Sequence, residues 1–229
     1  MAKLHRILLM TMMAMGCLNM QAQNDFANFQ RYYEDNQKVK NLPQEQRKVV
    51  FMGNSITQNW WSRHSSFFTD NGYIGRGISG QTSYQMVLRF YEDVVKLHPK
   101  AVVINAGTND IALNNHPYVE ERTLQNIITM AEMAKANKIK VILTTVTPCD
   151  HYTWRPEVTN VIEKIKSLNA RIEAYAKSHK CLFVDYFSAM ADERGAMREG
   201  ISDEGCHPNV AGYEIMESLV QAAIRKVVK

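Results

Sequence analysis

Residues 49–57 read VVFMGNSIT, an apolar run followed at once by a glycine and small polar side chains. A short run that is apolar throughout is typical of a strand buried on both faces of a parallel sheet. Comparable runs occur at 101–104, 141–143 and 181–184, and a weaker one at 73–78. The sequence therefore predicts a sheet of about five short strands, the first of them at 49–52.

Longer stretches with the helical spacing of apolar residues separate these runs, at 83–97, 118–136, 158–178 and 210–228. Another stretch, 25–40, places Phe26, Phe29 and Tyr33 on one face of an amphipathic helix. Strands that alternate with helices in this way predict the α/β class, a parallel sheet covered by helices on both faces. We find no internal repeat or linker, so we expect one α/β domain over 47–229, preceded by a helical extension over 23–46.

The first 22 residues have a different character. Lys3 and Arg6 make the start basic, residues 7–18 are almost all apolar, and Ala22 is a small residue before a plausible cleavage point. This layout predicts a secretory signal peptide over 1–22 and a secreted or periplasmic mature protein, because the apolar run is too short to span a bilayer. Lipid attachment at Cys17 is the alternative, although Met15 fits a lipobox poorly.

Charge and cysteine content exclude several classes of partner. The formal net charge is +4 and falls to +2 without Lys3 and Arg6, and no basic patch with interleaved aromatics occurs, so we expect no nucleic-acid partner. No later apolar run is long enough for stable membrane insertion. The four cysteines lack a Cys-x-x-Cys pair and zinc-ligand spacing, so we expect neither a metal nor a cofactor. The oligomeric state stays open.

Polar segments follow the apolar runs, where open α/β sheets bind their ligands. Taken alone, the Ser55 segment is better explained as a helix cap, and each of the other segments is also consistent with a turn. Together they contain a serine, a glycine N–H, an amide side chain and a histidine beside carboxylates, which are the groups needed for acyl transfer. The residues concerned are Ser55, Gly80, Asn109 and His207, with Glu204 and Asp203 as the candidate acids.

These segments resemble the four motifs of the SGNH hydrolases, also called the GDSL lipase/esterase superfamily, in the same order and over residues 49–228. The resemblance implies a three-layer α/β/α sandwich with a flavodoxin-like parallel sheet, and hydrolysis of esters or thioesters without metal. By position, it makes Ser55 the nucleophile and His207 the general base. It also implies an oxyanion hole formed by the backbone N–H groups of Ser55 and Gly80 and the side chain of Asn109.

Two departures from the family pattern concern the site. Asn54 stands where the family usually has Asp, and we expect this change to adjust the turn without abolishing activity. The family's triad Asp usually lies three residues before the histidine, where this chain has Glu204, with Asp203 one position earlier. Glutamate serves in some Ser–His hydrolases. Register favours Glu204, and Asp203 remains the alternative.

The loop at 148–156 is long and carries the candidate substrate-binding residues. Tyr152 and Trp154 could stack on a sugar and Arg155 could bind a hydroxyl or carboxylate, although Trp154 could equally pack the loop down. The sequence has no long apolar lid, which favours an O-acetyl group on a carbohydrate as the substrate. The alternatives are a lysophospholipase or thioesterase of the same superfamily, and a non-catalytic glycan-binding module. Ser55, His207 and Asn109 occurring together favour an enzyme acting on a small ester or acetylated glycan.

Overall fold

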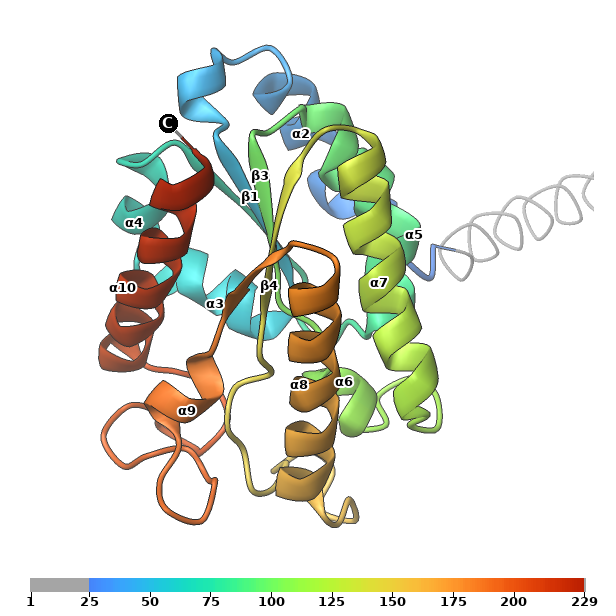
Figure 1. The fold of residues 1–229 in the computed structure, drawn as a ribbon, viewed down its shortest axis with the longest axis vertical. Coiled ribbons are helices and arrows are strands. Elements are labelled where there is room, and N and C mark those ends of the chain that lie inside the picture. The colour runs from blue at the N-terminus through green and yellow to red at the C-terminus, as the bar shows by residue number, and fades with distance from the viewer. Residues whose placement is uncertain (1–24, 229) are drawn as a thin grey trace, which may run out of the picture.

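A computed structural model describes residues 25–228, so the predicted signal segment 1–22 and Cys17 lie outside the described residues. Five parallel strands form one sheet in the order β2-β1-β3-β4-β5. Helices cover both of its faces, so the α/β prediction is confirmed (Figure 1). The strands are β1 (Val49–Gly53), β2 (Tyr73–Gly77), β3 (Ala101–Ile104), β4 (Lys140–Thr144) and β5 (Leu182–Val184).

Strand β1 lies between β2 and β3, with Val49 opposite Tyr73 on one side and Ala101 on the other. The chain moves outward in one direction from β1 to β2, and in the other direction from β3 to β5. This reversal makes the gap between β1 and β3 the topological switch point, where open α/β sheets bind ligands beyond the carboxyl ends of the strands. The loops that follow β1 and β3 therefore border one crevice.

Two helical layers enclose the sheet, as Figure 1 shows with α10, α4 and α3 on one side and α5, α7 and α8 on the other. The first layer contains α3 (Ser55–Arg63), α4 (Ser65–Thr69) and α10 (Val210–Val227). The second contains α5 (Ser83–Asp93), α7 (Glu120–Ala136) and α8 (Val161–Ser178). The remaining helices are short: η1 (Phe29–Tyr32), α2 (Tyr33–Val39), η2 (Gln44–Gln46), η3 (Val95–Leu97), α6 (Thr108–Ile111) and α9 (Tyr186–Met190).

Each helical layer buries its own hydrophobic core against one face of the sheet. The core under α3, α4 and α10 is aromatic: Phe51 of β1 contacts Trp60 edge to face, with ring centroids 5.4 Å apart. Trp60 is buried, whereas the neighbouring Trp61 is 42% exposed, so one of the two tryptophans belongs to the core. Burying rings of this size stabilises the packing of α3 on β1.

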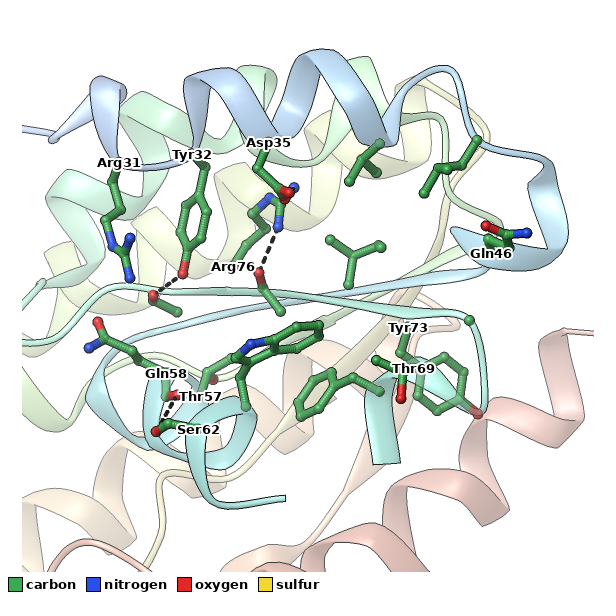
Figure 2. A pocket seen from close by; sticks show the side chains of 18 residues that line it. Arg31, Tyr32, Asp35, Gln46, Thr57, Gln58, Ser62, Thr69, Tyr73 and Arg76 are labelled. Carbon is green, nitrogen blue, oxygen red and sulfur yellow. Dashed lines mark hydrogen bonds and ion pairs between the residues drawn. The ribbon is translucent and has the colours of Figure 1, made fainter. Parts of the chain in front are cut away.

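The N-terminal segment differs from the helix predicted for 25–40. It forms a 3-10 turn and the short helix α2, and the predicted apolar face of Phe26, Phe29 and Tyr33 is 50%, 42% and 54% exposed. The opposite face packs instead, because Tyr32 donates a hydrogen bond of 2.5 Å to the Gly77 carbonyl (Figure 2). Asn36 on the same face donates to Asp93 at 2.7 Å. The hydrogen bonds of Tyr32 and Asn36, and not the burial of Phe26, Phe29 and Tyr33, thus determine the position of this segment on the fold.

Helix boundaries otherwise differ from the predicted ones by a few residues. Helix α7 begins at Glu120 instead of 118, because the residue before it, Val119, has an extended backbone. Helix α5 ends at Asp93, and the rest of the predicted helix 83–97 becomes the 3-10 turn η3. No helix among residues 25–228 is long and apolar enough to cross a membrane.

Candidate active site

Ser55 is the first residue of α3, directly after strand β1. The preceding Asn54 caps the helix, because its Oδ1 accepts a hydrogen bond of 3.0 Å from the Ile56 N–H. Asn54 is completely buried, and its Nδ2 has no partner among the described residues. The turn therefore presents the Ser55 hydroxyl at the carboxyl edge of the sheet, with the helix N-terminus behind it.

The loop that carries His207 is organised by Ser202. Its hydroxyl donates to the His207 carbonyl at 2.7 Å and accepts from the Gly205 N–H at 2.9 Å. After this loop, Asn209 caps α10 by accepting from the Gly212 N–H at 3.2 Å. A turn closed on itself and joined to a capped helix holds the imidazole in one position.

Ser55, His207 and Glu204 form one chain of hydrogen bonds. Ser55 Oγ lies 2.9 Å from His207 Nε2, and His207 Nδ1 lies 2.7 Å from Glu204 Oε1. The same Oε1 also accepts from the His207 backbone N–H at 2.5 Å. Because an ionised carboxylate only accepts hydrogen bonds, Nδ1 carries the proton and Nε2 is free to take one from the serine hydroxyl.

Asp203, the alternative acid, turns away from the imidazole. Its carboxylate pairs with Arg63 at 3.2 Å, and the Asp203 side chain is 64% exposed. The side chain of Glu204 is half as exposed, at 34%, and contacts the histidine ring. Of the two acids left open by the sequence, the geometry favours Glu204.

Gly80 and Asn109 lie at the same edge as Ser55. The Ser79 N–H, next to Gly80, donates to Gln58 of α3 at 2.9 Å. Asn109 Nδ2 donates to the Gln81 carbonyl at 2.9 Å, which keeps one of its two N–H bonds available. Within residues 25–228, the backbone N–H groups of Ser55 and Gly80 have no acceptor. These donors can therefore receive an oxygen of a bound molecule.

Two glycines give this edge its shape. Gly80 has φ +76°, a left-handed conformation that side chains disfavour. Gly107, at φ +123°, could not carry a side chain, because a Cβ there would lie 2.8 Å from Leu168 and Val146. The left-handed conformation of Gly80 sets the orientation of its backbone N–H. The absence of a side chain at Gly107 lets the loop before Asn109 pack closely against α8.

Asp110, next to Asn109, has a structural role, because its carboxylate is bonded within the protein. It is completely buried and accepts from the N–H of Ser83 at 2.9 Å and from its hydroxyl at 2.5 Å. Burial raises the pKa of Asp110, and the two Ser83 hydrogen bonds oppose that rise. Asp110 thus joins α6 to the start of α5.

Sequence reasoning missed Arg89, a completely buried residue of α5. Its guanidinium donates to the carbonyls of Gly53 and Arg76, both at 3.0 Å, and to Gln81 at 2.6 Å. It also pairs with Asp93 at 2.7 Å. Burial lowers the pKa of Arg89, and Asp93 raises it again. The Arg89 side chain thereby connects the ends of β1 and β2 to the loop over residues 78–82, which we call the Gly80 loop. The helical spacing in the sequence does not distinguish Arg89 from a surface arginine.

The predicted substrate loop is only partly placed as expected. Tyr152 is completely buried, and burial raises its pKa well above the usual range, so the prediction that it faces substrate is wrong. Trp154 is 37% exposed, with its ring 5.6 Å from that of His207. Arg155 donates to the Asn114 carbonyl at 3.3 Å. Trp154 and Arg155 lie at the edge of the site, and the buried Tyr152 packs against them.

A hollow of about 910 Å³ adjoins these residues. We call it the Gly80 hollow. Its walls come from the Gly80 loop, the loop after α6, the Trp154 loop and the N-terminal segment. Most of the lining side chains are amides or other polar groups, and they include Asp25, Asn28, Gln30, Gln81, Gln85, Asn114, Asn115, Trp154 and Arg155.

Cys206, next to His207, does not compete as a nucleophile. Its thiol is completely buried, and its side-chain hydrogen bond with Cys149, together with burial, raises the pKa of Cys206 well above the usual range. A thiol held protonated is a poor nucleophile. Within residues 25–228, no three His, Cys, Asp or Glu side chains are grouped as a metal site.

Comparison with known proteins identifies the family. The model of the GDSL-like Lipase/Acylhydrolase family matches residues 51–215. A crystal structure of a GDSL-like lipase from Bacteroides thetaiotaomicron is 53% identical, with a TM-score of 0.85, over 88% of this chain and 98% of that one. A candidate acylhydrolase from Bacteroides fragilis is 50% identical, with a TM-score of 0.87, over 89% of this chain and 99% of that one.

A curated relative, the acetylxylan esterase of Xylanibacter ruminicola, is 23% identical over 225 residues, which cover 82% of this chain and 45% of that protein. The chain spans less than half the length of the curated relatives it matches. The family match covers most of the chain, including Ser55, Gly80, Asn109 and His207. The chain therefore belongs to the GDSL-like lipase and acylhydrolase family.

Proposed function

We propose that the protein is a carboxylic ester hydrolase that acts through an acyl-enzyme on Ser55, with His207 as general base and Glu204 as the acid that orients it. The observation that carries the proposal is the continuous chain of hydrogen bonds from Ser55 Oγ to His207 and on to Glu204, at 2.9 and 2.7 Å. A neutral imidazole in this tautomer accepts the serine proton, and the carboxylate stabilises the imidazolium that forms.

The reaction proceeds in two halves. Ser55 Oγ attacks the ester carbonyl carbon while its proton moves to His207 Nε2. The alcohol then leaves with that proton, and the acyl group remains on Ser55. In the second half, a water molecule gives its proton to His207 and attacks the acyl carbon, which releases the carboxylic acid and restores the serine.

The oxyanion formed in both halves needs hydrogen-bond donors. We assign this role to the backbone N–H groups of Ser55 and Gly80 and to the remaining N–H of Asn109. Donors fixed in advance are worth most where charge develops, because they need no reorganisation during the reaction.

For the substrate, we propose O-acetyl groups on a carbohydrate. The Gly80 hollow supports this choice, because amide and charged side chains suit the hydroxyls of a sugar better than a hydrocarbon chain. The exposed face of Trp154 offers a surface on which a sugar can stack. The acetylxylan esterase relative points the same way, although it shares only 23% identity.

A comparison of acyl chain lengths tests the substrate class. The kcat/KM for 4-nitrophenyl acetate, butyrate and octanoate would be measured beside acetate release from acetylated xylo-oligosaccharides. We expect acetate to be preferred and the oligosaccharides to be deacetylated. Preference for octanoate would contradict the carbohydrate proposal and favour a lysophospholipase, and faster cleavage of an acetyl thioester than of the oxygen ester would favour a thioesterase.

We also propose that residues 1–22 form a signal peptide and that 23–46 and 47–229 are the extension and the catalytic domain. The basic start, apolar run and Ala22 support this division. Mass spectrometry of the protein exported by its host tests it. A mature N-terminus at Gln23 is expected, whereas a lipid-modified Cys17 would support the lipoprotein alternative.

A further inference from the structure

Asn114, a residue outside the family motifs, connects three segments of the site. Its Nδ2 donates to the Gly80 carbonyl at 3.1 Å and to Asn109 Oδ1 at 3.0 Å. Its Oδ1 accepts from Trp154 Nε1 at 3.0 Å. The Gly80 loop, the Asn109 helix and the Trp154 loop therefore meet at one amide.

The chemistry of these groups fixes the orientation of both amides. An indole N–H can only donate, so the atom of Asn114 that faces Trp154 must be the oxygen. The amide nitrogen of Asn114 must then face Asn109, which can meet it only with its own oxygen. Asn109 Nδ2 then donates to the Gln81 carbonyl, and its second N–H has no acceptor among the described residues. Reversing either amide would place two donors or two acceptors against each other.

We propose that Trp154 and Asn114 are positioning residues that aim the Asn109 donor at the oxyanion. The inference rests on the proposed function, because it assigns a source of order to the proposed oxyanion hole. Trp154 lies on the wall of the Gly80 hollow, so the side chain that a bound alcohol group would touch also determines the polarity of the hydrogen bonds around Asn109.

The competing role for Trp154 is stacking against substrate alone. The two roles separate in Trp154→Phe, which keeps an aromatic face and removes the N–H. They separate again in Asn114→Leu, which keeps the side-chain shape and removes every hydrogen bond of the amide. Stacking would be reflected in KM, whereas a misdirected oxyanion donor lowers kcat.

The test is a double-mutant cycle with 4-nitrophenyl acetate. Complete loss of one oxyanion donor costs about 10²- to 10³-fold in kcat, so a misdirected donor should cost about tenfold. We expect Trp154→Phe and Asn114→Leu each to lower kcat by about that factor with little change in KM. Because both substitutions break the same chain of hydrogen bonds from Trp154 through Asn114 to Asn109, the double variant should be no slower than the slower single variant.

The matched control is Trp61→Phe, an exposed tryptophan on α3, which should leave kcat unchanged. Thermal unfolding would verify that each variant folds, with Asn114→Ser replacing Asn114→Leu if the latter does not. The proposal is overturned if Trp154→Phe keeps its kcat, if only KM changes, or if the two losses multiply. Activity remaining in Ser55→Ala would instead refute the proposed function, so the two failures are distinguishable.

Discussion

The Gly80 hollow can be compared with a second hollow of about 800 Å³ that runs along the edge strand β2 (Figure 2). In this second one, the β2 hollow, Arg31, Tyr32 and Asp35 of the N-terminal segment lie on one side of the strand and Thr57, Gln58 and Ser62 of α3 on the other. The two hollows have similar volumes, but their polar groups have different partners.

Arg76 and Tyr32 of the β2 hollow are paired within the protein. Arg76 binds Asp35 at 2.7 Å, Asn36 at 2.9 Å and the Gly75 carbonyl at 2.8 Å, and Tyr32 binds the Gly77 carbonyl. The lining of the Gly80 hollow instead includes Gly80, whose backbone N–H has no acceptor in the described chain, and Trp154, whose ring lies 5.6 Å from that of His207. We therefore expect unpaired donors, and not volume, to distinguish a reactive cavity from a structural one.

Removing the nucleophile should have the largest effect. Ser55→Ala should lower kcat for 4-nitrophenyl acetate by at least about 10⁴-fold, since the acyl-enzyme can no longer form. The thermal transition should scarcely move, because the hydroxyl contacts only His207 among the described side chains. Ser62→Ala, a serine of the β2 hollow on the same helix, is the matched control and should retain full activity.

The acids next to His207 give the second prediction. Glu204→Gln should lower kcat by roughly 10²- to 10⁴-fold, because the imidazolium loses its carboxylate and the ring its fixed tautomer. Asp203→Asn should stay within about twofold, since an exposed pair with Arg63 contributes little. Comparable losses in both variants would mean that the geometry at Glu204 is not what orients the histidine.

Deleting the amide donor should come third. Asn109→Ala should reduce kcat by about 10²- to 10³-fold with a small change in KM, the effect of losing one oxyanion donor. Steady-state kinetics on the folded variant, verified by thermal unfolding, would measure it. A rise in KM at constant kcat would place Asn109 in ground-state binding instead.

The β2 hollow should give the smallest effect on catalysis. Arg76→Met should lower the free energy of unfolding by about 1–3 kcal/mol, because Asn36 loses a buried donor. The loss stays below that for a fully buried ion pair, since Asp35 is 55% exposed and can be rehydrated. Urea unfolding and kcat would be measured on the same preparation. A tenfold fall in kcat at unchanged stability would break the comparison between the two hollows.

Much of the fold could be predicted from the sequence, because buried parallel strands and amphipathic helices leave local patterns. The five apolar runs fall within a residue or two of the observed strands. The N-terminal segment was the exception, since Phe26 and Phe29 suggested a buried face whereas Tyr32 and Asn36 make the contacts. A pattern of apolar residues cannot reveal a helix that is held by polar anchors.

The site was partly predictable for a related reason. Ser55 and His207 sit in recognisable motifs at strand and helix ends, but Tyr152 and Trp154 looked alike in the sequence, and only one is exposed. Asn114 could not be found, because its role depends on hydrogen bonds to residues 34 and 40 positions away. Contacts between distant loops form only once the sheet brings the loops together.

Covalent labelling tests the central claim most directly. A fluorophosphonate would react with the active serine by losing fluoride, and peptide mapping by mass spectrometry would locate the adduct. We predict one adduct per chain, on Ser55, with activity lost in proportion to labelling and no adduct in Ser55→Ala. An adduct on another residue that accompanies inactivation, or full activity in protein labelled at Ser55, would contradict the account.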